Sequence, residues 1–137
     1  MIGMKKWWSY LIVALIVMNE RHFAKRFLRK HYNVDLTVPI YVSTKILREG
    51  SLGIFVMKNA YEPSYIAIDA SLASSKNRQL FRRVLIHELI HYALFVQQLP
   101  FQDDSPLFHK EVIKHGSLLS GQVMIENGHF SLLDEAI

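Results

Sequence analysis

The chain has 137 residues, of which 50% are hydrophobic and 12% aromatic, so it is not an intrinsically disordered protein and fits one domain with its own core. It contains no cysteine, which excludes a disulfide framework, a thiolate zinc site and a cysteine nucleophile. The formal net charge of +4 permits an anionic partner without requiring one.

The excess apolar character of the chain lies near its N-terminus, in residues 1–18. Lys5 and Lys6 precede a run of mostly apolar side chains over residues 7–18. This pattern is typical of a signal peptide or a membrane anchor, but the run is shorter than the roughly 20 residues of a spanning helix. Three interpretations stay open: a buried helix that continues into the next segment, an interfacial or signal-like anchor, and a true start at Met18.

The rest of the chain, residues 19–137, is predicted to form one domain, because it shows no internal repeat, low-complexity tract or linker. We treat residues 1–18 as a separate apolar segment. The expected location is cytoplasmic, and the alternative is membrane association through residues 7–18.

A basic helix is predicted at the start of the domain, over residues 19–32. Its apolar side chains share one stripe, whereas Arg21, Lys25 and Arg29 recur every four residues on a different face. A charged run of this kind is usually a solvated face, and the alternative is a face that binds phosphates. Nucleic acid is therefore a partner that the sequence permits.

Three short strands are predicted next, over residues 38–42, 52–57 and 65–69, where β-branched and aromatic side chains gather. Turn-forming residues separate the strands, and this spacing favours an antiparallel meander. Pro39 cannot donate a backbone hydrogen bond and therefore predicts a strand start or an edge strand.

Two further helices are predicted after the strands, which makes the fold class α+β. The first covers residues 79–96 and the second covers residues 107–114, with Pro106 in the first turn and an end near Gly116. Three polar residues can cap the first of these helices: Ser74, Ser75 and Asn77.

The sequence His87-Glu88-Leu89-Ile90-His91 lies inside the first of these helices. Residues four apart point to the same side of a helix, so the imidazoles of His87 and His91 can hold one Zn²⁺ at about 2.0–2.1 Å each. Glu88 follows the first ligand and is placed to reach a metal-bound water rather than the metal. It can accept the proton of that water during attack on a carbonyl and return it to the leaving amine.

The alternative to a metal site is a structural helix on which the two histidines stack and Glu88 is exposed. Residues 84–96 are otherwise apolar apart from Tyr92, so this alternative leaves unpaired polar groups in an apolar stretch. Each such group costs about 1–3 kcal/mol when it is buried. One metal ion satisfies both imidazoles at once, and we therefore expect a metal site.

A basic helix, three strands and then a helix bearing VLIHELIHYALF resemble the SprT-like zinc metallopeptidases. The resemblance covers roughly residues 18–116 and is supported by Leu52 and Gly53 before the second strand and by Phe108 and Gly116 in the next helix. It implies a minimal zincin-like fold, one zinc per chain and hydrolysis of peptide bonds in a protein or peptide substrate. Eukaryotic members of that family cleave proteins crosslinked to DNA.

The third metal ligand departs from the family pattern, which usually supplies a histidine just before the last of these helices. Asp103 and Asp104 stand there instead, and Asp is a legitimate zinc ligand. Asp103 falls into the slot of the family's bacterial pattern, and Asp104 fits the shorter spacing of its other branch. His109 and Glu111 are the remaining candidates, and a helix N-cap is the alternative role for the two aspartates.

We therefore predict an α+β, minimal zincin-like domain that acts as a zinc metallopeptidase. His87, His91 and Asp103 are expected to bind the zinc, and Glu88 to serve as general base and acid. The edge strand beside the active helix, predicted to be the third strand, is expected to pair with an extended peptide. The alternative is a non-hydrolytic zincin-like module that binds or regulates a protein or nucleic acid.

Overall fold

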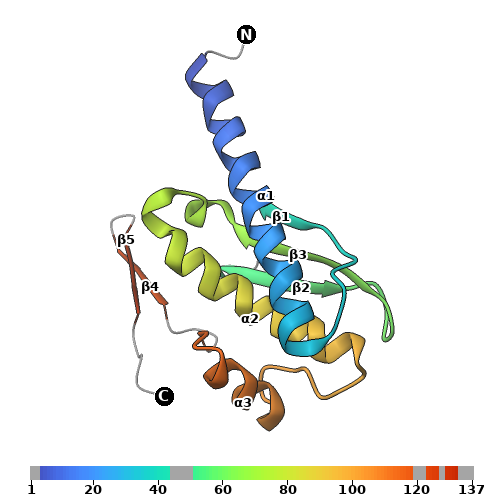
Figure 1. The fold of residues 1–137 in the computed structure, drawn as a ribbon. Helices are drawn as coiled ribbons and strands as arrows, with labels where there is room; N and C mark the ends of the chain where they lie inside the picture. Colours follow the sequence, from blue (N-terminus) through green and yellow to red (C-terminus); the bar gives the residue numbers. More distant parts are fainter. Residues whose placement is uncertain (1–3, 44–50, 119–122, 127–128, 133–137) are drawn as a thin grey trace.

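The computed structural model describes residues 4–43, 51–118, 123–126 and 129–132, and it describes side chains for residues 15–43 and 51–118. The fold is α+β, as predicted, and Figure 1 shows its helices packed along a small sheet. The elements in chain order are α1 (Met4–Tyr32), β1 (Ile40–Ser43), β2 (Gly53–Met57), β3 (Pro63–Asp69), the short 3₁₀ helices η1 (Ala70–Leu72) and η2 (Ser75–Asn77), α2 (Arg78–Val96), α3 (Pro106–Lys114), β4 (Val123–Glu126) and β5 (His129–Leu132).

The main sheet is mixed, so the predicted antiparallel meander is wrong. Its strand order is β1-β3-β2, in which β1 runs parallel to β3 and β2 runs antiparallel to it. The third strand is central because Ile66, Ala67 and Ile68 form a continuous, fully buried run, which suits a strand with a neighbour on each side. A tight hairpin, closed by the Lys58 N–H and the Glu62 carbonyl, joins β2 to β3.

Pro39 stands at the edge of the sheet, directly before β1. Its carbonyl accepts a hydrogen bond from the N–H of Ile66 at 3.1 Å. Because Pro39 precedes the first residue of an edge strand, its missing N–H removes no bond from the ladder. The prediction of a strand start or an edge strand at this residue is confirmed.

The central helix α2 packs against β2 and β3, whereas α1 packs against α2 and β1. The start of α2 is not capped as predicted. Asn77 stands at the N-cap position, but its side-chain amide donates to the carbonyl of Ser71 at 3.1 Å and makes no capping bond. Ser74 likewise makes no side-chain capping bond. The helix is held instead by its buried face, which includes Phe81, Leu85 and Leu89.

The last helix, α3, confirms the predicted start and end signals. The Ser105 hydroxyl accepts a hydrogen bond from the N–H of Phe108 at 3.4 Å, and Pro106 occupies the first turn. Gly116 follows the helix with a φ of +64°, a conformation that favours glycine. Because Ser105 is the N-cap, the capping role considered for Asp103 and Asp104 is wrong.

The first helix, α1, runs without a break through the apolar segment and the basic segment (Figure 1). Leu15 and Met18 are 50% and 67% exposed, so the helix is not buried there, whereas Ala24, Phe27 and Leu28 are buried in the core. Among the described residues, no helix combines the length and the apolar character needed to cross a membrane.

A buried ion pair fixes α1 to α2. Glu20 is 2% exposed, and its two carboxylate oxygens accept hydrogen bonds from Arg82 Nε at 3.1 Å and Nη2 at 2.9 Å. The same guanidinium lies 4.1 Å from the centre of the Phe23 ring. The ion pair with Glu20 and the cation–π contact with Phe23 together orient the helix that carries the histidines.

Removing one partner of this pair should destabilise the fold. In Arg82→Ala the described cation that remains near the buried Glu20 carboxylate is Arg78, at 4.0 Å, and we expect a loss of about 2–3 kcal/mol in the free energy of unfolding. The control is Arg29→Ala, because the Arg29–Asp35 pair is 61% and 75% exposed and should contribute about 0–1 kcal/mol. Chemical denaturation measures both; equal stability losses would contradict the assignment.

Candidate metal centre

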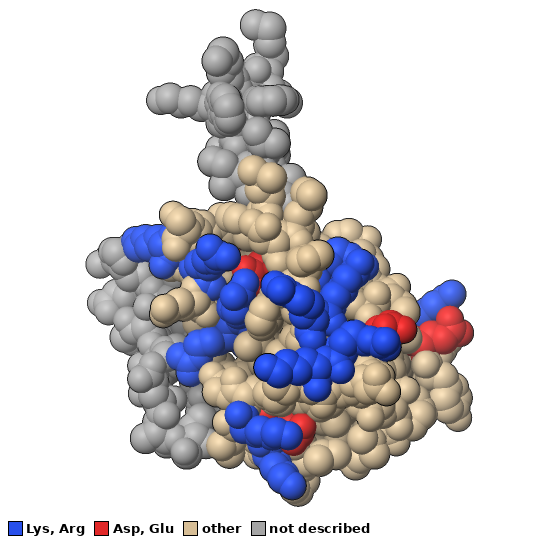
Figure 2. All heavy atoms as spheres, viewed as in Figure 1, with Lys and Arg blue, Asp and Glu red and all other residues tan. Residues whose placement is uncertain are grey.

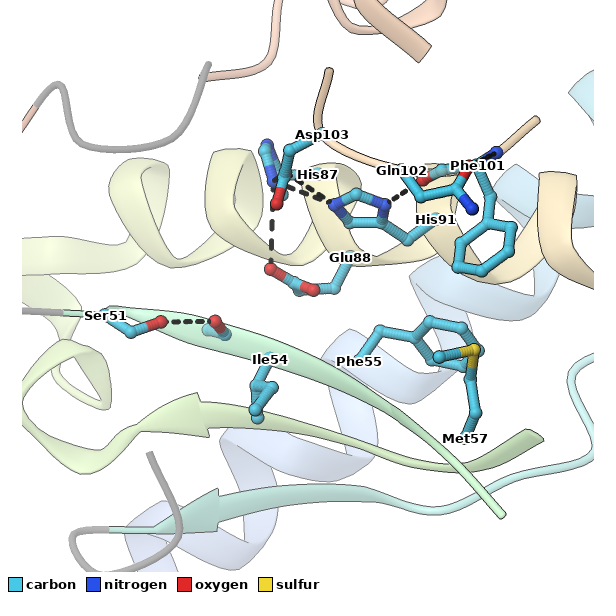
Figure 3. Close-up of a pocket in the computed structure, with 11 residues that line it drawn as sticks. Ser51, Ile54, Phe55, Met57, His87, Glu88, His91, Phe101, Gln102 and Asp103 are labelled. Atoms are coloured by element: carbon cyan, nitrogen blue, oxygen red, sulfur yellow. Dashed lines mark hydrogen bonds and ion pairs between the residues drawn. The ribbon is translucent and has the colours of Figure 1, made fainter. Parts of the chain in front are cut away.

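The two histidines of α2 point at the same spot beside the helix, close to Asp103 (Figure 3). They lie one turn apart, and their Nε2 atoms are separated by 3.2 Å. His87 and His91 are 7% and 8% exposed, so both rings are largely shielded from water. The helical spacing therefore brings the two imidazoles together as the sequence predicts.

Asp103 reaches the two imidazoles from the loop between α2 and α3. Its Oδ1 atom lies 3.0 Å from Nε2 of His91 and 3.4 Å from Nε2 of His87. Ligands at about 2.0–2.1 Å from a tetrahedral zinc are separated by about 3.3 Å. The three distances, 3.0, 3.2 and 3.4 Å, match that spacing. These residues form a group that can hold a metal ion.

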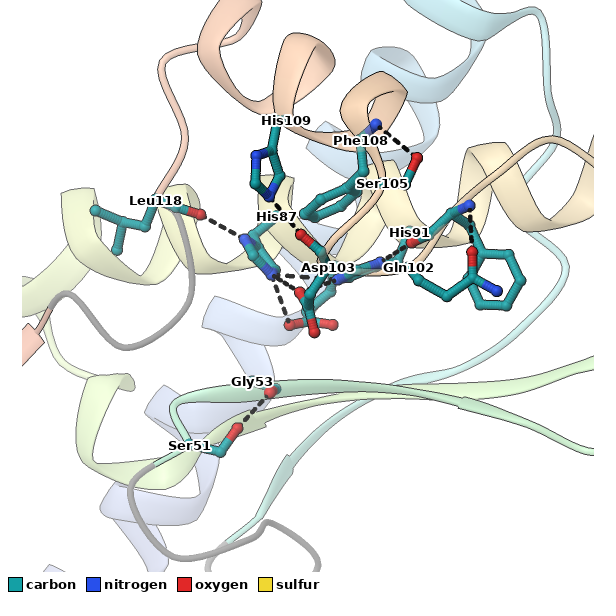
Figure 4. A network of polar contacts seen from close by, with 12 residues as sticks. Ser51, Gly53, His87, His91, Gln102, Asp103, Ser105, Phe108, His109 and Leu118 are labelled. Atoms are coloured by element: carbon teal, nitrogen blue, oxygen red, sulfur yellow. Dashed lines mark hydrogen bonds and ion pairs between the residues drawn. The ribbon is translucent and has the colours of Figure 1, made fainter. Parts of the chain in front are cut away.

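Backbone carbonyls fix which nitrogen of each ring faces this spot. Nδ1 of His87 donates to the carbonyl of Leu118, and Nδ1 of His91 donates to the carbonyl of Phe101 (Figure 4). A carbonyl can only accept, so each Nδ1 carries the proton and each neutral ring presents the lone pair of Nε2. This is the tautomer that a metal ligand needs.

The Phe108 ring holds the imidazoles in place from the side of α3. It stacks on His91 with ring centres 3.9 Å apart and meets His87 edge-on at 5.0 Å. Phe108 is 1% exposed, so this contact is rigid. The ring therefore leaves the two histidines little freedom to turn away from each other.

Two lone pairs and a carboxylate oxygen converge in this space, and they repel one another unless a positive charge lies between them. Burial alone would lower the pKa of His87, but its hydrogen bond with Asp103 and the nearby Glu88 carboxylate raise the pKa overall. A proton can thus fill the space in acid, and it competes with a metal ion there. Metal affinity should therefore fall as the pH falls.

Glu88 lies beside the three ligand atoms without joining them. Its Oε1 atom is 4.0 Å from Nε2 of His87, and the residue is 6% exposed, so the alternative with an exposed Glu88 is wrong. Burial raises the pKa of Glu88 above its usual value, although the two imidazoles lower it in part. The carboxylate is placed to exchange a proton with a molecule bound at the metal position.

Gly53 allows strand β2 to approach this carboxylate closely. A Cβ atom at Gly53 would lie 2.7 Å from Cγ1 of Val84 and 3.2 Å from Cγ of Glu88. The strand therefore packs against α2 directly beside the Glu88 side chain. From the sequence, Gly53 was identified only through the family resemblance. No other sequence pattern predicts its contact with Glu88.

A cleft of about 330 Å³ opens next to the three ligand atoms. Strand β2 forms one wall, α2 forms the other, and the loop before α3 closes one end (Figure 3). The residues that line it are Ser51, Gly53, Ile54, Phe55, Met57, His87, Glu88, His91, Phe101, Gln102 and Asp103. The three ligand atoms are thus accessible to a ligand that enters this cleft.

The other candidates for the third ligand take different positions. Nε2 of His109 donates to the main-chain carbonyl of Asp103, so it supports the loop rather than facing the imidazoles. The Glu111 carboxylate accepts a hydrogen bond from the Tyr32 hydroxyl at 2.9 Å. Asp104 is exposed and is not part of the ligand group found among the described residues.

No known family model, curated protein or solved structure matches the chain. The resemblance to SprT-like metallopeptidases therefore stays a hypothesis based on the sequence motif.

Removing the third ligand should weaken metal binding more than removing its neighbour. We expect one zinc per chain in the parent protein, and a loss of affinity of roughly tenfold or more in Asp103→Ala, because only two of three protein ligands remain. Asp104→Ala is the matched control and should bind like the parent. Competition with a chromogenic chelator measures the affinities.

Two results would contradict this assignment. One is a parent protein that takes up no zinc from a metal-buffered solution. The other is a loss of zinc in Asp104→Ala that equals the loss in Asp103→Ala.

Proposed function

We propose that this protein is a zinc-dependent peptidase that hydrolyses peptide bonds in protein or peptide substrates. The observation that carries the proposal is the position of the Glu88 carboxylate, which is buried and 4.0 Å from a histidine of the ligand group. A purely structural metal site has no need of a buried acid beside it, whereas a hydrolytic site needs a base there.

The chemistry is divided between the metal and Glu88. His87, His91 and Asp103 would hold a zinc ion, which would supply Lewis-acid chemistry: it would lower the pKa of water at the site to about 7 and polarise the substrate carbonyl. Glu88 accepts the proton of the attacking water and delivers it to the leaving amine. Its raised pKa suits this task, because a base works best when its pKa is near the working pH.

The acidic third ligand distinguishes this site from one with three imidazoles. The Asp103 carboxylate adds a negative charge to the centre, which makes a bound zinc less electrophilic and its water less acidic. Because Asp103 is 63% exposed, solvent screens part of that charge. We therefore expect slow turnover rather than a highly active enzyme.

Strand β2 is the surface on which an extended peptide can lie. It pairs with β3 on one side only among the described strands, and its residues line the cleft beside the ligand group. The open edge offers backbone N–H and C=O groups to a peptide. The predicted substrate strand was the third, and this is wrong because β3 is central and has both edges occupied.

Replacing the base should abolish hydrolysis and leave the metal in place. Glu88→Gln keeps the size of the side chain but cannot accept a proton, and we expect activity on dye-labelled, unfolded casein to fall by about 10²–10⁴-fold. The zinc content should equal that of the parent protein. Glu62→Gln, at an exposed hairpin position, is the control and should cleave normally.

The proposal fails if the zinc-loaded Glu88→Gln variant hydrolyses casein at the parental rate. It also fails if the parent protein binds zinc but cleaves no peptide bond under any condition that preserves its fold.

A second candidate function is a non-hydrolytic module that binds a polyanion, and the charge distribution favours it. Figure 2 shows Lys and Arg side chains gathered over the C-terminal half of α1 and the adjoining part of α2. The sequence places five of these cations between residues 21 and 30. Among the described residues, the buried Glu20 and the exposed Asp35 form ion pairs with this face. Such a face can bind nucleic-acid phosphates.

This second candidate predicts binding to a mixed-sequence DNA duplex of about 20 base pairs, with an affinity that falls steeply as salt rises. The double variant Lys25→Glu with Arg26→Glu should weaken binding by roughly tenfold or more, because both side chains are exposed on α1. Lys58→Glu, in the β2–β3 hairpin, is the control. Fluorescence anisotropy measures the affinities, and no binding at low salt would eliminate this candidate.

A further inference from the structure

The cleft has two chemically different ends on either side of the ligand group. At one end Ser51 and Gly53 lie near Glu88, and the Ser51 hydroxyl is bonded to the Gly53 carbonyl at 2.7 Å. At the other end Figure 3 shows the side chains of Phe55, Met57 and Phe101 side by side, beyond His91. We call these three residues the apolar end.

The two aromatic rings of the apolar end pack against a buried side chain of α2. Phe55 and Phe101 both pack edge-on against Phe95, with ring centres 5.4 Å and 5.1 Å away. Phe95 is 2% exposed and belongs to α2, the helix that carries both histidines. The position of the apolar end relative to the metal ligands is therefore fixed by packed aromatic rings.

The apolar end also exposes apolar surface to water. Met57 is 42% exposed, and Phe55 and Phe101 are only partly buried. The charged or titratable side chains that line the cleft are His87, Glu88, His91 and Asp103, which all belong to the metal centre. Among the described residues, the apolar end offers no charged partner to a charged ligand group, whereas an apolar group would bury surface there.

The spacing along β2 relates the apolar end to the reacting bond. Gly53 packs against Glu88, and Phe55 lies two residues further on, which is about 7 Å in a strand. A peptide that pairs with β2 and presents a carbonyl beside Glu88 thus carries a side chain to the apolar end within about two residues of that carbonyl.

We propose that the apolar end is a specificity subsite that binds a large apolar side chain of the substrate, within two residues of the bond that is cleaved. The subsite rests on the proposed peptidase function for its biological use. Its binding preference is set by Phe55, Met57 and Phe101 and does not depend on turnover. The substrate class is therefore an extended peptide segment with Leu, Met, Phe or Tyr within two residues of the scissile bond.

Cleavage sites in an unfolded protein mixture provide the first test. Mass spectrometry of the products should show large apolar residues enriched about tenfold over acidic ones at one position near the cut. Met57→Lys places a cation at the rim of the subsite and should shift the preference toward Asp and Glu. Leu99→Lys is the matched control, because Leu99 is 41% exposed and does not line the cleft, so its profile should equal that of the parent.

Peptide binding provides a test that does not need turnover. Zinc-loaded Glu88→Gln should bind an extended octapeptide that contains one Phe about tenfold more tightly than the same peptide with Asp in that place. Met57→Lys in the same background should remove or reverse the difference. Isothermal titration measures both affinities.

The outcomes separate the subsite from the proposed function. Hydrolysis without any positional preference, or an unchanged profile in Met57→Lys, overturns the subsite and leaves the peptidase intact. Selective binding of the Phe peptide without hydrolysis supports the subsite and overturns the peptidase. If the protein shows neither hydrolysis nor selective binding, both the subsite and the peptidase function are overturned.

Discussion

Three acceptor atoms that point at one small volume are the constraint on which the site depends. The Nε2 atoms of His87 and His91 and the Oδ1 atom of Asp103 lie 3.0–3.4 Å apart, and the histidines cannot turn their protons inward without breaking their bonds to carbonyls. Such an arrangement is stable only around a positive charge. The fold thus keeps three electron-rich atoms close together, and this group can hold a divalent cation, with which a proton competes in acid.

Residues far apart in the sequence hold these ligand atoms in place. The segment after α3 supplies the Leu118 carbonyl, the loop after α2 supplies Phe101 and Asp103, and α3 supplies the Phe108 ring. Further along α2, the Tyr92 hydroxyl is bonded to the carbonyl of Asp35 at 2.7 Å and so ties the helix to the segment before β1. Each contact restrains α2 from a different direction, which keeps the histidines oriented before any ligand arrives.

Local patterns in the sequence predicted the helices, while non-local pairing decided the rest. The residues of α2 and α3 show helical periodicity or end signals, and the i, i+4 histidines follow from helix geometry alone. The order of the strands was missed because β1 pairs directly with β3 and not with β2, the next strand in the sequence, and residue types do not encode that choice locally. The carbonyls of Phe101 and Leu118 could not be found from sequence at all, because every residue has a carbonyl.

The position of a bound zinc ion is the most direct test of this account. Crystals of the zinc-loaded protein, measured on both sides of the zinc absorption edge, should show one anomalous peak at about 2.0–2.2 Å from Nε2 of His87, Nε2 of His91 and a carboxylate oxygen of Asp103. The Glu88 carboxylate should lie beside the ion without coordinating it. A structure with the two imidazoles in place and no peak between them, or with zinc bound away from Asp103, would contradict the central claim.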